Sequence, residues 1–273
     1  MIHGINDGCA GKQSFIDRHF PGFDAKCIES GRGQVGSFEG EISRVCNQLN
    51  EEEAELVDGF TLFGISQGAL IARGVLQRCH VGRYVKRFIS MGGPHQGVAI
   101  IPRTQPSDFI NTFIHLCRFR VFQWLVGPCG YIRDLRLNDP DKVRNVLTDL
   151  NNEFEFNSQY KDRMRNLNLY INIAFKQDEM VQPYNSSIFG YFKDSSYASY
   201  IEMEDTKLYK EDLLGLRELY NDRRLFLCEV EGRHLELESK YMKLLIEDLA
   251  DWSSADYTKN LEAMKQVCRF KLE

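Results

Sequence analysis

The sequence predicts an α/β protein with a mostly parallel central sheet flanked by helices. One observation supports this fold class, and two others support its organisation as a single domain. Short apolar stretches alternate with segments of helical period, an order typical of parallel sheets covered on both faces. The chain has 273 residues with 43% hydrophobic content, enough for one sizeable core. It contains no internal repeat and no low-complexity linker. We therefore expect a single domain over residues 1–273.

The predicted elements follow in chain order. Strands are expected at 59–63, 85–91, 167–175 and 224–230, and helices at 67–79 and 239–250. Functional sites in such sheets form at the carboxyl ends of the strands. The chain opens with Met1-Ile2 directly before His3-Gly4, so we expect the given sequence to start inside its first strand, with any targeting segment upstream.

Between residues 98 and 166 the alternation stops, and a helix-leaning stretch rich in aromatic residues takes its place. We expect a cap or lid inserted between two strands of the sheet. Phe113, Phe122 and Trp124 are candidates for lining an apolar groove in this cap. In the alternative interpretation, these side chains form the insertion's own core. Residues 251–273 are expected to form a C-terminal helical extension.

Charge and hydropathy argue against two kinds of partner. The formal net charge is −5, and no Lys/Arg run is dense enough to bind a phosphate backbone, so we predict no nucleic-acid partner. Charged residues interrupt every apolar tract before it reaches the roughly 18 to 20 residues of a membrane-spanning helix. We also predict no cofactor.

The eight cysteines lack the paired spacings of a zinc site, so we predict no metal and expect disulfides or buried thiols. Their even number favours an oxidising compartment. The chain has one acceptor tripeptide for N-glycosylation, Asn185-Ser186-Ser187, of a kind expected about once by chance in a chain this rich in Asn.

The stretch Gly64-Ile65-Ser66-Gln67-Gly68 follows a predicted strand and opens a predicted helix. A nucleophile elbow requires this context of strand, turn and helix. Flanking glycines let the backbone and the helix approach closely while the serine is held at a strained turn. Ser66 is therefore the candidate nucleophile, and the alternative is an ordinary hydroxyl in a tight turn.

A serine hydroxyl needs a neighbouring base, and proteins with this elbow place Ser, then Asp or Glu, then His along the chain. Among the histidines, only His234 follows a late strand, which makes it the candidate base. Asp178 and Glu179 both follow the preceding strand, and we select Asp178 as the acid that orients the imidazole. His95 precedes both acids in the chain, so we interpret it as structural.

Two backbone amides are candidates for holding an oxyanion. The amide of Gln67 directly follows the candidate nucleophile and points towards the place where an oxyanion would form. Ile5 lies at the end of the first strand, where a second donor is expected.

In family order, the segments "HGIND", "GISQGAL", "LQRC", "SMGGPHQGV", "DEMVQP", "LGLRELYN" and "EGRHLEL" resemble palmitoyl-protein thioesterases of the lysosomal type, members of the α/β-hydrolase superfamily. The resemblance implies an α/β-hydrolase fold with Ser66 as nucleophile, Asp178 as orienting acid and His234 as base. It implies oxyanion amides at Ile5 and Gln67. It also implies S-palmitoylated proteins or peptides, or small palmitoyl thioesters, as substrates and a lysosomal or secreted location.

The resemblance further implies that the 98–166 insertion binds the acyl chain and that Cys46 and Cys79 form a disulfide. The sequence departs from the family at two places in the first loop. Asn6 stands where the family usually has glycine, which puts the conformation of the oxyanion loop in question. Cys9 lacks its usual neighbouring cysteine and is expected to be free or paired elsewhere. A bridge between Cys117 and Cys129 inside the cap is a further option.

The sequence thus predicts a hydrolase that removes long-chain fatty acyl groups from S-acylated cysteines through a Ser-His-Asp acyl-enzyme mechanism. Two alternatives remain open. A lipase or carboxylesterase acting on oxygen esters would use the same three side chains. A catalytically inactive hydrolase-fold protein that binds lipid would keep the fold without the activity.

Overall fold

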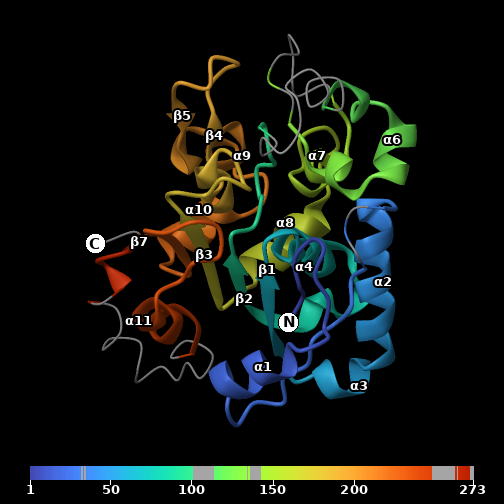
Figure 1. Cartoon of the computed structure of the whole chain (residues 1–273), viewed down its shortest axis with the longest axis vertical. Coiled ribbons are helices and arrows are strands. Elements are labelled where there is room, and N and C mark those ends of the chain that lie inside the picture. The colour runs from blue at the N-terminus through green and yellow to red at the C-terminus, as the bar shows by residue number, and fades with distance from the viewer. Residues whose placement is uncertain are drawn as a thin grey trace.

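The computed structural model describes residues 1–31, 33, 35–100, 114–133, 135, 143–247, 262 and 264–270. At its centre lies a five-stranded sheet in the order β1-β2-β3-β6-β7 (Figure 1). The parallel strands are β1 Phe60–Ile65, β2 Val85–Met91, β3 Leu169–Phe175 and β6 Leu225–Val230. Strand β7, Cys268–Arg269, pairs with β6 in the antiparallel sense. The predicted mostly parallel α/β class is confirmed.

Helices pack on both faces of this sheet (Figure 1). The α-helices are α1 Gln13–His19, α2 Phe38–Glu51, α3 Glu53–Leu56, α4 Gln67–Arg78, α6 Arg120–Leu125, α7 Val146–Leu150, α8 Ser158–Arg165, α9 Lys207–Lys210, α10 Leu216–Asn221 and α11 Ser239–Met242. A π-helical turn, η6 Lys243–Glu247, follows α11, and short 3-10 turns are η1 His80–Tyr84, η2 Gly127–Gly130, η4 Tyr184–Ile188 and η5 Met203–Asp205. A separate hairpin pairs β4 Tyr191–Phe192 with β5 Tyr200–Ile201.

The two faces of the sheet belong to two separate hydrophobic cores. Along β6, Leu225 and Leu227 enter the core shared with α2, α4, α8 and α10, whereas Phe226 and Cys228 enter the core shared with α1 and α11. Successive side chains of a strand point to opposite faces, so each buried strand serves both cores. The first predicted strand is reduced to Ile2, which bridges in parallel to Ile28 and Gly64.

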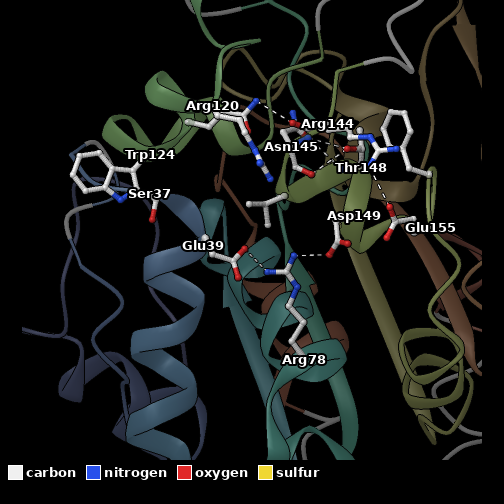
Figure 2. A pocket seen from close by; sticks show the side chains of 13 residues that line it. Ser37, Glu39, Arg78, Arg120, Trp124, Arg144, Asn145, Thr148, Asp149 and Glu155 are labelled. Carbon is white, nitrogen blue, oxygen red and sulfur yellow. Dashed lines mark hydrogen bonds and ion pairs between the residues drawn. The ribbon is translucent and has the colours of Figure 1, made fainter.

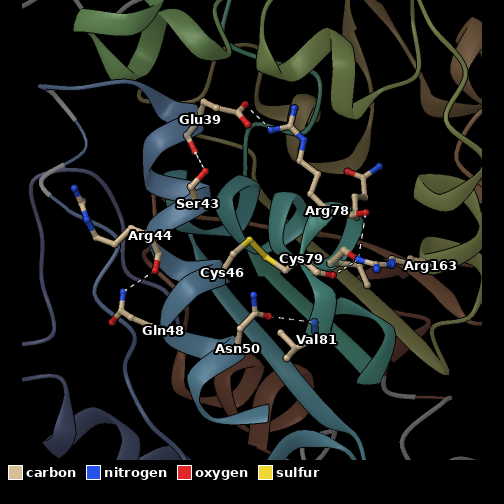
Figure 3. The surroundings of a disulfide bond; sticks show 12 residues. Glu39, Ser43, Arg44, Cys46, Gln48, Asn50, Arg78, Cys79, Val81 and Arg163 are labelled. Carbon is tan, nitrogen blue, oxygen red and sulfur yellow. Dashed lines mark hydrogen bonds and ion pairs between the residues drawn. A yellow bond between two sulfur atoms is a disulfide. The ribbon is translucent and has the colours of Figure 1, made fainter.

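Four disulfides join described cysteines: Cys9–Cys27, Cys46–Cys79, Cys117–Cys129 and Cys228–Cys268. The Cys46–Cys79 bond implied by the family resemblance is present and ties α2 to the end of α4 (Figure 3). Beside it, the Arg163 guanidinium donates to the carbonyl oxygen of Cys79. Cys9, expected to be free or paired elsewhere, is paired with Cys27.

The predicted insertion over 98–166 contributes side chains to two cores. Helices α7 and α8 contribute Leu147, Leu150 and Met164 to the main core, so they cover the sheet like its other helices. Among the described residues of the insertion, the segment from Ile114 to Ile132 has a small core of its own, built around the Cys117–Cys129 bond.

The predicted C-terminal extension over 251–273 is described only in part. Its residues Cys268 and Arg269 form a strand rather than a helix, because they pair with β6 and are tied to it through Cys228. No helix within the described residues combines the length and the apolarity needed to cross a bilayer.

Candidate active site

Ser66 occupies the sharp turn between β1 and α4. Its backbone torsions are φ 54° and ψ −127°, a combination that side chains other than glycine rarely adopt. The conformation is held in place, because the Ser66 amide donates to the carbonyl of Met91 in β2 at 2.7 Å. The turn of a nucleophile elbow lifts the hydroxyl above the carboxyl end of the sheet.

The two glycines of the elbow motif are both sterically required. A Cβ placed on Gly64 would lie 2.4 Å from the Cα of Ala69. One placed on Gly68 would lie 2.2 Å from the carbonyl oxygen of His3. Both distances are far below van der Waals contact and involve backbone atoms, so helix α4 reaches its position only with glycine at these two sites.

The structure brings Ser66, His234 and Asp178 into one hydrogen-bonded series. The Nε2 atom of His234 lies 2.9 Å from Ser66 Oγ, and its Nδ1 atom lies 2.6 Å from Asp178 Oδ2. Asp178 follows β3 and His234 follows β6, so parallel neighbours in the sheet deliver both side chains to the same edge. The Asp178 side chain is fully buried, and the imidazole keeps a small exposed fraction of 13%.

The structure distinguishes Asp178 from Glu179, the two acids that follow β3 in the sequence. The second oxygen of Asp178, Oδ1, accepts hydrogen bonds from the amides of Met180 and Val181 at 2.7 and 2.9 Å. These bonds fix the carboxylate in the orientation that meets the imidazole. Glu179 points to solvent instead and lies 3.6 Å from Arg233.

His95 is buried away from this series, as the sequence analysis expected of a structural residue. Its Nε2 atom lies 2.7 Å from Ser90 Oγ, and its ring stacks on Phe189 at 5.1 Å. Burial, followed by the charge of Arg73, holds the pKa of His95 well below its ordinary value. His95 is therefore a neutral packing residue.

The turn that carries Ile5 lies against Ser66. The amide of Asp7 donates to the Gly4 carbonyl, and a Cβ on Gly4 would lie 3.2 Å from the Cβ of Ser66. Asn6 has a positive φ of 58°, in the left-handed region that glycine and asparagine tolerate best. Asparagine in the family's glycine position therefore suits the backbone that the turn requires.

The side chain of Gln67 is clamped by two buried partners, which the sequence analysis did not identify. Its Nε2 atom donates to Glu41 of α2 at 2.6 Å, and its Oε1 atom accepts from the hydroxyl of Tyr131 at 2.9 Å. Burial raises the pKa of the Glu41 carboxyl, against hydrogen bonds from Gln67 and the Gly33 amide that lower it. No local pattern links these residues, because they come from three separate segments of the chain.

The backbone amide of Gln67 is separate from this side-chain network. Gln67 is the first residue of α4, so its amide has no acceptor within the helix. Gly33 packs against both oxyanion candidates, since its Cβ would lie 2.8 Å from Gln67 Nε2 and from Ile5 Cγ1. The side chains of both candidate residues thus lie against one glycine of the loop before α2.

The described residues contain one grouping with metal-ligand chemistry, formed by His3, Cys9 and Glu29. Cys9 is bonded to Cys27, so its sulfur cannot act as a thiolate ligand. Glu29 instead bridges the first loop, with one oxygen 2.9 Å from His3 Nε2 and the other accepting from the Cys9 amide at 2.9 Å.

The three aromatic candidates for an apolar groove have different outcomes. Phe122 packs against the small core around the Cys117–Cys129 bond, which matches the alternative interpretation of this insertion. Trp124 is 68% exposed and lies on the outside of the cap. Phe113 lies outside the described residues. A groove lined by these side chains stays a prediction.

The glycosylation tripeptide is buried. Asn185 is 1% exposed, and its side-chain amide donates to the Ile201 carbonyl at 3.4 Å. A glycan attached to this nitrogen would have no room in the folded chain, so the match is not an acceptor site in this fold.

A strained serine between a parallel strand and a helix, with His234 and Asp178 delivered by later strands, makes this protein an α/β hydrolase. The family model described as palmitoyl protein thioesterase matches residues 1–234. The chain therefore belongs to the palmitoyl protein thioesterase family.

The chain is also similar to individual proteins. Palmitoyl-protein thioesterase 1 of Caenorhabditis elegans is 31% identical over 256 residues, covering 87% of this chain and 86% of that protein. A lysosomal thioesterase of Xenopus laevis, PPT2-B, is 29% identical over 182 residues, covering 64% of this chain and 62% of that protein. Among solved structures, a monoacylglycerol lipase of Paleococcus ferrophilus aligns with a TM-score of 0.46 and 13% identity, over 92% of this chain and 93% of that one.

Proposed function

We propose that this protein hydrolyses the thioester between a long-chain fatty acyl group and a cysteine, with Ser66 as the nucleophile. The observation that carries the proposal is the unbroken hydrogen-bonded series from Asp178 through His234 to Ser66. Family membership supplies the substrate class, since the relative from Caenorhabditis elegans is named a palmitoyl-protein thioesterase.

The first half-reaction forms the acyl-enzyme. As Ser66 Oγ attacks the thioester carbonyl carbon, His234 Nε2 takes the hydroxyl proton. The negative charge that develops on the carbonyl oxygen is stabilised by the amides of Ile5 and Gln67. The carbon–sulfur bond then breaks, and the departing cysteine sulfur receives the proton from His234.

The second half-reaction releases the fatty acid. Water attacks the Ser66 ester while His234 removes its proton, and the same imidazole then returns a proton to Ser66 Oγ as the carbon–oxygen bond breaks. Asp178 keeps its charge throughout and stabilises the imidazolium that forms twice in each turnover.

The leaving group makes acylation the easier half. A cysteine thiol has a pKa of about 8.5, far below that of an alcohol, so its anion departs with little help from an acid. Breaking the serine ester has no such advantage, and deacylation is therefore expected to limit the rate. Long chains gain about 0.8 kcal/mol per CH₂ removed from water, so chain-length preference is assigned to an apolar groove in the 98–166 insertion.

We place the protein in the lysosome or outside the cell. Four disulfides among the described cysteines suit an oxidising compartment. The Xenopus laevis relative is named a lysosomal thioesterase, which favours the lysosome. Immunolocalisation of the tagged full chain tests this assignment, and a cytosolic signal contradicts it.

The decisive test compares substrates. Purified protein should release palmitate from a palmitoyl-cysteine peptide much faster than from glycerol esters, and Ser66→Ala should abolish both. Faster cleavage of the glycerol esters would identify a lipase or carboxylesterase instead. Labelling of the wild type, but not Ser66→Ala, by a fluorophosphonate is expected, and absence of labelling would favour an inactive lipid-binding protein.

A further inference from the structure

We propose that one face of the cap docks on the anionic surface of a lipid bilayer. The face consists of Val35, Val121, Trp124 and Leu125, and we refer to it as the cap face. All four side chains are exposed, with exposed fractions of 87% for Val35 and 68% for Trp124. Large apolar side chains grouped in this way mark an interaction surface more often than isolated ones do.

The geometry of α6 separates this face from the cap's own core. Val121, Trp124 and Leu125 are spaced i, i+3 and i+4, so they share one side of the helix. Phe122 and Val126 occupy the other side and pack against the Cys117–Cys129 bond. The helix is therefore held firmly while its apolar side faces outwards.

The loop before α2 extends the cap face towards the catalytic serine. The Gly36 amide donates to the Leu125 carbonyl at 2.9 Å, and Val35 bridges to Val126. Two residues earlier, Gly33 packs against Ile5 and the Gln67 side chain. The cap face is thus joined, through the loop before α2, to a glycine that contacts Ile5 and Gln67 of the proposed oxyanion site.

Local charge favours an anionic surface. The protein carries a net charge of −5, but the segment from Ile114 to Tyr131 contains Arg118 and Arg120 and no acidic residue. Both arginines are exposed, and neither forms an ion pair within the described part of the chain. Trp with flanking Arg is the composition of helices that lie at the surface of anionic membranes.

The acids that line the cavity beside α6 are matched in number by arginines. A cavity of about 550 Å³ separates α6 from α7, and Figure 2 shows Trp124 on the opposite side of it from Arg144. Across this cavity, Arg78 binds Glu39 and Asp149 at 2.5 Å each. Three carboxylates, of Glu39, Asp149 and Glu155, and three guanidinium groups, of Arg78, Arg120 and Arg144, line this cavity, so its charges balance. Arg118 is not part of this lining, and its positive charge is left in excess.

The docking proposal rests on the proposed function in one respect, namely that the substrate carries a palmitoyl chain. A palmitoyl chain on a protein is normally inserted in a membrane, so an enzyme that removes it gains from contact with the bilayer. A soluble partner protein would not require basic residues beside an apolar side of a helix, and we therefore commit to the lipid surface.

The first experiment uses Trp124 as its own reporter. The chain has two tryptophans, so the full-length Ser66→Ala, Trp252→Phe protein reports Trp124 alone. Vesicles of phosphatidylcholine with phosphatidylserine should shift its emission to shorter wavelength, and lipids with brominated acyl chains should quench it. Unchanged emission together with no co-sedimentation would overturn the proposal.

Matched variants then separate the apolar and charged contributions. Val121→Ser with Leu125→Ser should lower vesicle partitioning roughly tenfold or more. Arg118→Gln with Arg120→Gln should lower partitioning onto anionic vesicles by about 30-fold and leave partitioning onto neutral vesicles nearly unchanged. Val57→Ser is the control, because Val57 is also exposed but follows α3, at the opposite end of the view from α6 (Figure 1).

These experiments distinguish a failure of the docking proposal from a failure of the proposed function. If wild-type protein cleaves a soluble palmitoyl peptide while Ser66→Ala ignores vesicles, docking is wrong and the proposed function stands. If Ser66→Ala binds vesicles but the wild type cleaves nothing, the proposed function is wrong and docking stands. Concentration-dependent dimers that Val121→Ser with Leu125→Ser abolishes, without vesicle binding, would identify a contact between two copies and overturn the proposal.

Discussion

Replacing Gly68 by alanine should damage catalysis far more than the same change at Gly74. Both glycines lie buried in α4, and alanine improves the intrinsic helix propensity at each position by about 1 kcal/mol. Their surroundings differ. The Cβ of Gly68→Ala would meet backbone oxygens of His3 and Ile2 at 2.2 and 2.5 Å, whereas that of Gly74→Ala would meet the side chain of Ile42 at 2.5 Å.

The size of the effect of each substitution on activity and stability follows from these contacts. Real Cβ atoms essentially never come closer than 3.0 Å to another heavy atom, so the His3 carbonyl must retreat by 3.0 − 2.2 Å, about 0.8 Å. This movement displaces the turn that carries Ile5, and a misplacement of about 1 Å in a catalytic group costs on the order of 10²-fold in rate. Ile42 can change rotamer instead, so Gly74→Ala is limited to about 1–3 kcal/mol of overpacking, partly offset by helix propensity.

The assay measures kcat and KM on a soluble palmitoyl thioester, together with the thermal unfolding midpoint of each variant. Gly68→Ala should lose about 100-fold in kcat, and Gly74→Ala should stay within a few-fold of wild type. Measuring well below each variant's midpoint separates inactivity from unfolding. Equal kcat values for two folded variants would refute the argument that close approach of α4 to the first loop sets the oxyanion geometry.

Three further predictions concern the surroundings of the site. Tyr131→Phe leaves Gln67 Oε1 buried without its donor, which should cost about 1–3 kcal/mol of stability in chemical unfolding and lower kcat more than it raises KM; an unchanged kcat would contradict this. Because burial raises the folded-state pKa of Glu41, the stability that its protonated form contributes is present below the unfolded pKa of about 4.3 and is lost as pH rises through the folded pKa. The midpoint difference between Glu41→Gln and wild type should therefore grow in favour of the variant from acid to neutral pH, and a flat difference argues against it. Replacing Cys46 and Cys79 together by alanine releases a 33-residue loop and should cost about 4 kcal/mol in denaturant unfolding, with a loss below about 1 kcal/mol as the contrary result.

The parts of the fold set by local patterns could be predicted from the sequence. The stretch 85–91 is the β2 strand of the structure, and the stretch 67–79 contains α4, because buried strands and helices leave clear apolar patterns. The nucleophile elbow could also be predicted, because its glycines stand at fixed offsets from Ser66. The fixed order of Ser, acid and His along the chain then limited the candidates for the two remaining side chains.

The parts set by contacts between distant segments could not be predicted. The clamp on Gln67 joins α2 to Tyr131, which are far apart in the chain, and no spacing encodes such a meeting. The partner of Cys9 was open for the same reason, because cysteine positions alone do not determine connectivity. The role of the aromatic residues in the insertion was open as well, because aromatic content alone does not tell which side of a short helix faces outwards.

The most direct test of the central claim is to trap the acyl-enzyme. The wild type is mixed with a palmitoyl thioester, quenched in acid within a few turnovers and digested for mass spectrometry. The peptide that contains Ser66 should gain one palmitoyl group, and His234→Ala should not accumulate it. Turnover with the palmitoyl group on a different residue, or turnover by Ser66→Ala at the wild-type rate, would contradict the account.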